Sequence, residues 1–255
     1  MIVRGYRQLK EHYHRLERGD VFVGRIPGGP LRHAMLIDLL QRGVQCCPSA
    51  LAQNLNGSKT AQAVVFEPWM APHTRVIRRR SDLLAAIEAC NRAGIAAVVT
   101  KEDRLHCGHG VRRWENVETL YNMVAFAPTT YPFVMQPYLT HFIDVRVIIA
   151  GDYREAYERI NPGNFRRNLS AGGRSRAYDL NEDTERFCRS VMARGQFPYA
   201  HLDLHIVDTD TRYLSEIALD GGTKGAQLDR QLLDRAKKDV LEGLVKTFDN
   251  RRRSQ

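Results

Sequence analysis

A nearly continuous apolar run at residues 95–100 constrains the fold of this chain more than any other feature. Its sequence, IAAVVT, follows Gly94 and ends at Lys101. An apolar run of this length after a glycine fits a buried strand, and a helical pattern precedes it at residues 82–93. The chain is therefore expected to build a covered sheet and to end one of its inner strands on a lysine.

The other segments alternate between strand and helix patterns. Turn residues at Gly151-Asp152 indicate a hairpin, and a strand, a glycine-containing loop and a helix at residues 20–41 predict a small α/β lobe. Residues 102–113 and the cationic stretch after Gly163 are predicted to be loops. Strands are predicted at 20–26, 74–78, 133–139, 144–150, 153–160, 199–207 and 212–217, and helices at 6–18, 31–41, 58–66, 82–93, 183–194 and 228–248.

Length and composition point to a folded protein. The chain has 255 residues, of which 43% are hydrophobic, so it can bury a sizeable core. No stretch reaches the roughly 18 consecutive apolar residues of a membrane span, and the N-terminus is polar and charged. A cytoplasmic protein is the default expectation. The five cysteines are never spaced as CxxC, which excludes a disulfide framework or a zinc knuckle.

The net charge of +9 would attract phosphates on any fold. However, the arginine clusters at residues 78–80 and 251–253 are separate, and no recognisable nucleic-acid module accompanies them. Nucleic acid is therefore not expected as the main partner. An anionic small substrate or an acidic peptide is equally compatible with the charge.

Three groups of residues could carry chemistry. Lys101 and the loop Gly108-His109-Gly110-Val111 could bind a polyphosphate through an ammonium and backbone N–H groups, although such residues are often only a solvated loop. Asp203 and Glu216 lie on neighbouring predicted strands among apolar residues, where a cation such as Mg²⁺ would offset their repulsion; the alternative is an edge charge or a pairing with arginine. Arg146, Arg159 and Asn168 fall near further arginines, which suits phosphoryl transfer but is also typical of a solvated face.

The segment 164–173 reads NFRRNLSAGG, and residues 144–147 read DVRV. Taken in order with the preceding groups, they resemble the ATP-grasp family, particularly the branch that adds glutamate to the ribosomal protein S6 tail and the related lysine-biosynthesis ligases. The resemblance covers roughly residues 56–228. Its most specific part is 164–173, which follows the family's Phe-Arg-x-Asn…Gly-Gly pattern, and Arg159 matches a second strand arginine.

The resemblance implies a set of residues that bind ATP. Lys59, within NGSKT, and Lys101 would hold the phosphates, and the loop from Gly108 to Val111 would close over them. The segment Gln136, Pro137, Tyr138 and Leu139 resembles the hinge whose backbone holds adenine. The usual Gln-Glu pair is here Gln136-Pro137, and proline removes one backbone donor.

The resemblance also implies a magnesium site. Asp203 and Glu216 occupy the positions of the family's acidic ligands, but the asparagine that completes the site is replaced by Ala218. Alanine cannot coordinate Mg²⁺, so either Asp203 and Glu216 bind one ion with additional waters, or Asp220 substitutes. Weakened catalysis, or none, is one consequence left open.

The resemblance thus implies an α+β, ATP-grasp fold in which two α+β lobes grip ATP. The expected parts are a short N-terminal α/β lobe at 1–55, a small lobe with the glycine loop at 56–130 and a C-terminal lobe with the metal site at 131–255. The implied enzyme is an ADP-forming carboxylate–amine ligase acting through an acyl phosphate, with Arg146, Arg159 and Asn168 as its catalytic residues. A kinase on the same fold, a nucleotide-binding protein without turnover, and a basic RNA- or DNA-associated factor are the alternatives. Homodimers are frequent on this fold, and the sequence leaves the substrates and the oligomeric state open.

Overall fold

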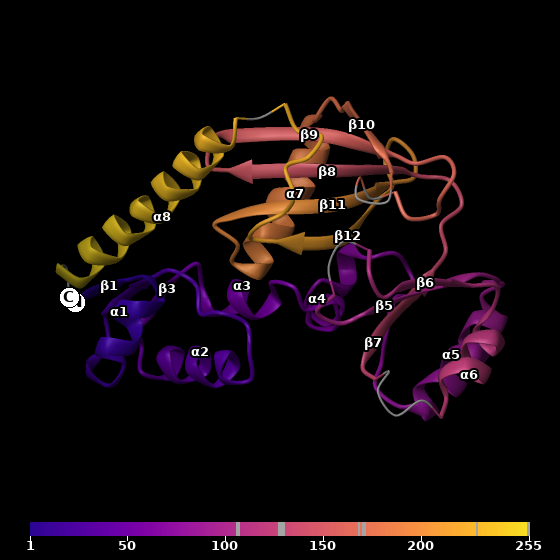
Figure 1. Ribbon diagram of the computed structural model, residues 1–255, viewed down its shortest axis with the longest axis horizontal. Coiled ribbons are helices and arrows are strands. Elements are labelled where there is room, and N and C mark those ends of the chain that lie inside the picture. Colours follow the sequence, from indigo (N-terminus) through magenta and orange to yellow (C-terminus); the bar gives the residue numbers. More distant parts are fainter. Residues whose placement is uncertain (106–107, 127–130, 168, 170–171, 228, 254–255) are drawn as a thin grey trace.

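A computed structural model describes residues 1–105, 108–126, 131–167, 169, 172–227 and 229–253 of the chain. The chain forms three sheets, each with its own helices, and the third sheet along the chain lies above the first two in the view of Figure 1. Each sheet is built mainly from one continuous part of the sequence.

The first sheet has three parallel strands in the order β1-β2-β3. Its core contains Leu9, Phe22, Leu36 and Leu39, all fully buried. This arrangement confirms the small α/β architecture predicted near the N-terminus. The elements are β1 (Ile2–Arg4), α1 (Gly5–His12), η1 (Tyr13–Arg15), β2 (Val21–Val23), α2 (Leu31–Gln41), β3 (Gln45–Cys47) and α3 (Ala50–Leu55).

The second sheet has four antiparallel strands in the order β4-β7-β5-β6. Two helices pack on it through a separate core that includes Leu83, Leu120, Phe133 and Met135. Figure 1 shows both helices together beside this sheet. The elements are β4 (Arg75–Ile77), α5 (Arg80–Arg92), β5 (Val98–Glu102), β6 (Val111–Trp114), α6 (Val117–Val124) and β7 (Phe133–Pro137).

Strand β5 begins three residues later than the apolar run predicts. Gly94 takes a positive φ of 64°, and the N–H of Ile95 donates to the carbonyl of Cys90, which closes α5. Residues 95–97 therefore connect the helix to the strand. The strand also extends to Glu102, so Lys101 lies inside β5 and not at its end.

The third sheet has five antiparallel strands in the order β10-β9-β8-β11-β12. The predicted hairpin of β8 and β9 is confirmed, whereas β10 lies in a segment predicted to be a loop. Helix α7 is capped by Asn181 and packs on the sheet through Cys188 and Val191. The elements are β8 (Ile143–Ala150), β9 (Tyr153–Ile160), β10 (Arg174–Ala177), α7 (Glu182–Gly195), β11 (Tyr199–Ile206) and β12 (Arg212–Ala218).

Three further elements, α4 (Lys59–Val65), η2 (Glu67–Trp69) and α8 (Arg230–Arg253), link the sheets. After α4, Phe66 packs into the core of the five-stranded sheet, and α8 carries Leu233 in that core and Val245 against the first sheet. Figure 1 shows α8 running from the third sheet to the first. Among the described residues, no helix is long and apolar enough to cross a membrane.

Two segments pack across the expected lobe limit at 130/131. Strand β7 lies beyond residue 130 but pairs with β4 and β5 of the preceding sheet. Conversely, Ala63 of α4 lies before that limit and belongs to the core of the five-stranded sheet. Strand β7 and helix α4 therefore each pack with a sheet on the other side of that limit.

Candidate active site

A cavity of about 640 Å³ lies between the four-stranded and the five-stranded sheets. It is lined from one side by β5 and β7 and from the other by β8, β9, β11 and β12. Asn168 lies outside the described residues, and Gly110 is not among the lining residues. All other predicted site residues line this one cavity: Lys59, Lys101, Gly108, His109, Val111, Gln136, Pro137, Tyr138, Leu139, Arg146, Arg159, Asp203 and Glu216.

Two arginines and two aspartates form a cluster on the five-stranded sheet, which we call the guanidinium cluster. Strand register places Asp203 opposite Arg146 and Asp144 opposite Arg159. Arg146 donates from Nε to Asp203 Oδ1 at 2.7 Å and from Nη2 to Oδ2 at 2.9 Å. Arg159 donates from Nη1 to Asp203 Oδ2 at 3.0 Å and from Nη2 to Asp144 Oδ1 at 2.5 Å. All four side chains are at least four-fifths buried, so the sheet holds these charges in a fixed arrangement.

Burial and pairing act in opposite directions on the two carboxyl groups. Burial alone would raise the pKa of Asp203, but the Arg146 and Arg159 guanidinium groups outweigh it and hold that pKa below its usual range. For Asp144, burial dominates and raises the pKa despite the Arg159 ion pair. Asp203 is therefore the carboxylate that the two arginines keep ionised.

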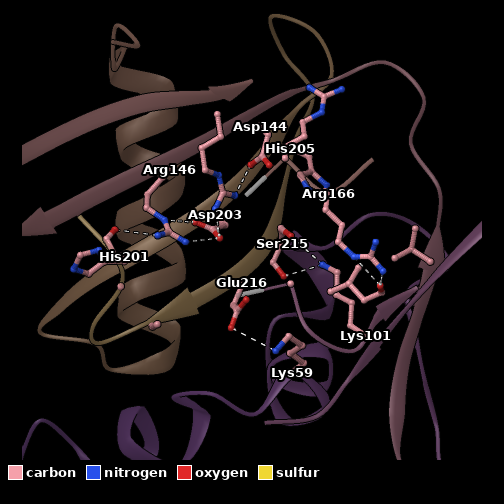
Figure 2. A pocket seen from close by; sticks show the side chains of 18 of the residues that line it. Lys59, Lys101, Asp144, Arg146, Arg166, His201, Asp203, His205, Ser215 and Glu216 are labelled. Carbon is pink, nitrogen blue, oxygen red and sulfur yellow. Dashed lines mark hydrogen bonds and ion pairs between the residues drawn. The ribbon is translucent and has the colours of Figure 1, made fainter. Parts of the chain in front are cut away.

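The two lysines lie across the cavity from the guanidinium cluster (Figure 2). The Lys59 Nζ donates to the Leu105 carbonyl and lies 3.8 Å from Glu216 Oε1. The Lys101 Nζ donates to Ser215 Oγ at 2.9 Å and to the Ser215 carbonyl at 3.3 Å. Both ammonium groups are thus bound mainly by neutral oxygens, and Glu216 is the acid nearest to them.

Lys101 has a strongly perturbed pKa. Burial lowers the pKa of Lys101 to about 8, the Lys59 ammonium adds to this effect, and Glu216 opposes it. A buried ammonium with neutral partners is stabilised by any anion that enters the cavity. The lysine side of the cavity therefore favours a polyanionic ligand.

Helix α4 brings Lys59 to the cavity and is fixed at both of its sides. Its N-cap Ser58 accepts from Ala61 N, and Asp103 accepts from Thr60 N at 3.0 Å. The Gln62 amide donates to the Ile217 carbonyl at 2.8 Å and accepts from Ile217 N at 3.0 Å. In this way Gln62 continues the hydrogen bonding of β12 and holds α4 against its edge.

The glycine loop leads directly into β6. Val111, predicted to be its last residue, is the first residue of that strand, and its carbonyl accepts from Arg166 Nε at 3.1 Å. Gly110 has a φ of 73°, and a Cβ there would lie 2.6 Å from Leu105 Cδ1. Glycine is thus needed at this turn both for its backbone conformation and for space.

A turn after β12 closes the cavity on its other side. The Gly222 carbonyl accepts from Arg146 Nη1 at 3.1 Å and from the Tyr157 hydroxyl at 3.3 Å. His201 lies beside this turn, and burial together with the nearby Lys237 lowers the pKa of His201 to about 4. His201 is therefore a neutral packing partner of the turn at neutral pH.

The carboxylates fit a single magnesium ion. Each carboxylate oxygen can accept about two bonds. Within the described part of the chain, Oδ2 of Asp203 accepts from both arginines and Oδ1 accepts from Arg146 alone, so Oδ1 keeps one acceptor position. Glu216, opposite Asp203 on β12, has Lys59, at 3.8 Å, as its one ion-pair partner among the described residues. One or two carboxylates completed by phosphates and water suit Mg²⁺.

The structure does not favour the substitute ligand considered for this site. Asp220 forms ion pairs with Arg25 and, at 2.8 Å, with Lys237. Within the described residues, no three acidic, histidine or cysteine side chains are grouped to hold a metal. Among the described residues, Asp203 and Glu216 therefore remain the candidate donors, and Ala218 offers none.

Sequence reasoning did not select Asp144, Ser215 and His205, although all three line the cavity. Asp144 had a signal, since it stands two residues before Arg146 on the same strand and so points to the same face. His205 likewise lies two residues after Asp203. No sequence pattern points to Ser215, because its contact is the hydrogen bond from Lys101, which approaches from another sheet.

We compared the chain with protein-family models and with solved structures, and both comparisons find ATP-grasp proteins or ligases. The family model of the RimK-like ATP-grasp domain matches residues 55–238. Among solved structures, a D-alanine–D-alanine ligase from Bacillus anthracis complexed with ATP has a TM-score of 0.63 at 14% identity, covering 97% of this chain and 84% of that chain. The D-cycloserine synthetase DcsG gives 0.60 at 16% identity over 92% and 85% of the two chains.

The ATP-grasp ligase PsnB, complexed with a precursor variant, Mg and ADP, gives a TM-score of 0.56 at 14% identity over 86% of this chain and 79% of that chain. At these identities the solved structures show the fold alone. No curated protein matches the chain by sequence.

Proposed function

Because the chain belongs to the RimK-like ATP-grasp family, we propose that it uses ATP to join a carboxylate to an amine, forming an amide and releasing ADP and phosphate. The observation that carries this proposal is the single cavity in which two lysines, two carboxylates and two arginines converge from two sheets and from helix α4. Such a site offers positive charge for a polyphosphate beside a preorganised pair of guanidinium groups.

The reaction needs no nucleophile from the protein. An oxygen of the substrate carboxylate attacks the γ-phosphorus of ATP, the bond from that phosphorus to the β-phosphate oxygen breaks, and ADP leaves. The amine nitrogen then adds to the carbonyl carbon of the acyl phosphate. Loss of a proton from nitrogen and departure of inorganic phosphate complete the amide.

Lys59 and Lys101 are proposed to bind the phosphates of ATP. Their present acceptors, Leu105 O and the two oxygens of Ser215, are neutral, so phosphate oxygens would be stronger partners. The loop from Gly108 to Val111 would cover the phosphates. Adenine is proposed to contact the segment 136–139 that lines the cavity, with Pro137 contributing a carbonyl but no N–H.

Arg146 and Arg159 are proposed to stabilise the acyl phosphate and the adduct formed by the amine, together with Asn168. Asp203 would keep both guanidinium groups oriented through the hydrogen bonds already described. Glu216 and the remaining acceptor position on Asp203 would hold Mg²⁺, which, when bound, neutralises charge on the phosphate oxygens. The substrate is proposed to be an amino acid or a peptide.

The proposal is tested by ADP release from ATP and Mg²⁺ across a panel of amino acids and peptides, with mass spectrometry of the products. Glu216→Gln should lower substrate-dependent ADP release by about a hundredfold or more. Glu88→Gln is the matched control, because the Glu88 side chain is 72% exposed and pairs with Arg92 on the same helix, away from the cavity. Absence of ATP binding to the wild-type protein would overturn the proposal.

Oxygen labelling separates the ligase from a kinase. A ligase acting through an acyl phosphate transfers one ¹⁸O atom from a labelled carboxylate to inorganic phosphate, whereas a kinase leaves the phosphoryl group on its product. A protein that binds ATP without turnover is the second candidate, and Ala218 is the observation in its favour, since it supplies no ligand at a family metal position. ATP binding without ADP formation under every condition would support it.

A further inference from the structure

A second cavity, of about 440 Å³, lies where the first sheet meets the end of β12. Arg25, Gly28 and Arg32 line it from the N-terminal side, and Asn56 and Leu219 line it from the other. Asn56 also lines the active-site cavity, as does Asp220, the residue after Leu219. The two cavities are therefore neighbours that share one wall.

Positive charge exceeds negative charge around the second cavity. Arg25 pairs with Asp220, but that carboxylate also accepts from Lys237 at 2.8 Å. Burial lowers the pKa of Arg32, and the nearby Arg104 guanidinium lowers it further. The Arg104 carboxylate partner, Asp103, is shared with the N-terminus of α4. Among the described residues, two carboxylates, Asp103 and Asp220, are thus set against four cations, Arg25, Arg32, Arg104 and Lys237.

Arg32 also has an unused hydrogen-bond donor. Its Nε is buried and has no hydrogen-bond acceptor among the described residues. A buried donor without an acceptor destabilises the folded chain, and an acceptor supplied by water or by a ligand would recover part of that free energy. Carboxylates and phosphates are the groups that match the planar donors of a guanidinium.

The cavity has room for such a group. Gly28 lines it, and a Cβ built on Gly28 would meet no atom within 4 Å. We propose that the second cavity binds an oxyanion, a carboxylate or a phosphate, that the substrate carries at a position away from its reacting carboxylate or amine. This inference rests on the proposed ligase function, because it makes the cavity an extension of the same site.

The test compares matched pairs of compounds: glutamate with glutamine for a carboxylate, and phosphoserine with serine for a phosphate. Each compound is titrated calorimetrically into the full chain saturated with a non-hydrolysable ATP analogue and Mg²⁺, and is also assayed for ADP release. The wild-type protein should bind the anionic member of at least one pair about tenfold or more tightly than its neutral counterpart. The pair that is discriminated identifies the oxyanion.

Two variants localise the effect. Arg32→Gln removes the guanidinium, and Gly28→Leu fills the cavity without changing a charge; each should reduce the preference for the anion to near unity. Arg7→Gln is the control, since Arg7 is 92% exposed and pairs with Glu11 on α1, and it should keep the preference. Equal binding of both members of both pairs by the wild-type chain would overturn the inference, as would a preference that survives both cavity variants.

The readouts separate this inference from the ligase proposal. Failure of ADP release with every compound would count against the ligase, while the binding preference and its loss in Arg32→Gln would still decide the role of the second cavity.

Discussion

The two sides of the active-site cavity differ in how their buried charges are compensated. On the five-stranded sheet, the guanidinium cluster pairs each charge with an opposite charge, and Arg159 joins Asp144 to Asp203. Across the cavity, Lys59 and Lys101 are buried to a similar degree but donate to carbonyl and hydroxyl oxygens. One side balances its charges within the protein, and the other leaves its positive charge largely uncompensated.

This difference suggests a division of work between folding and binding. Breaking a buried ion pair by removing one partner leaves the other charge uncompensated, so the guanidinium cluster should matter for stability. A buried ammonium without a counterion opposes folding, so the two lysines should matter for ligand binding and not for stability. Substitutions that remove one charge from each side can break or sharpen this comparison.

The largest effect is expected for Arg159→Met. This change leaves the buried Asp144 without its ion-pair partner and removes one of the two arginines on Asp203, so the free energy of unfolding should fall by about 3–5 kcal/mol. Urea denaturation measures it. Arg176→Met is the control, because the Arg176 side chain is 69% exposed beside Glu158 and should contribute less than about 1 kcal/mol. Similar small losses for both variants would contradict the assigned role of the cluster.

Lys101→Met should weaken ATP binding without lowering the free energy of unfolding. The free energy of unfolding should stay the same or rise, because a buried ammonium is replaced by an apolar side chain of similar length. The dissociation constant for ATP should rise by about 10- to 100-fold, as expected for loss of a charge-assisted hydrogen bond. Calorimetric titration and urea denaturation of the same samples measure both. Lys10→Met is the control, because Lys10 is an exposed residue of α1, and a strongly destabilised Lys101→Met would place Lys101 with the guanidinium cluster instead.

The pKa of Lys101 gives a pH dependence with a defined sign. Its folded value, about 8, lies below the ordinary value of 10.5, so between these values the unfolded chain binds more protons. The contribution of Lys101 to stability should therefore rise with pH across this window, while ATP affinity should fall by up to about tenfold per pH unit above pH 8. Titrations from pH 7 to 9.5 test this. Lys101→Arg stays protonated and should show a flatter profile; equal slopes would rule out Lys101 as the titrating group.

Patterns that depend on a single strand or helix could be predicted from the sequence. The β8–β9 hairpin and α2 were predicted within one residue of their limits, and Asp203 and Glu216 were expected on adjacent strands, where the register places them directly opposite. Alternation and helical periodicity carry this information locally. Helix α6 was missed although Val117, Leu120 and Val124 follow that periodicity and Asn116 caps it.

Features that arise from packing between segments could not be predicted in the same way. Strand β10, RSRA, has no apolar residue facing a core and exists because its backbone pairs with β9. The bonds that Arg146 and Arg159 make to Asp203 need the register of three strands, and the Lys101 bond to Ser215 joins two sheets. The sequence suggested that these residues belong to one site, but their partners required the fold.

The smallest effect is expected at Ala218, where the sequence departs from the family pattern. Ala218 lines the cavity two residues after Glu216, so Ala218→Asn would add an amide oxygen close to the two carboxylates. The Mg²⁺ concentration needed for half-maximal binding of an ATP analogue should fall severalfold, and the free energy of unfolding should change little. Ala177→Asn, at an exposed strand position outside the lining of the cavity, is the control. If Ala218→Asn leaves the Mg²⁺ dependence unchanged, the ion does not lie against this part of β12, and the assignment of Asp203 and Glu216 as its ligands fails with it.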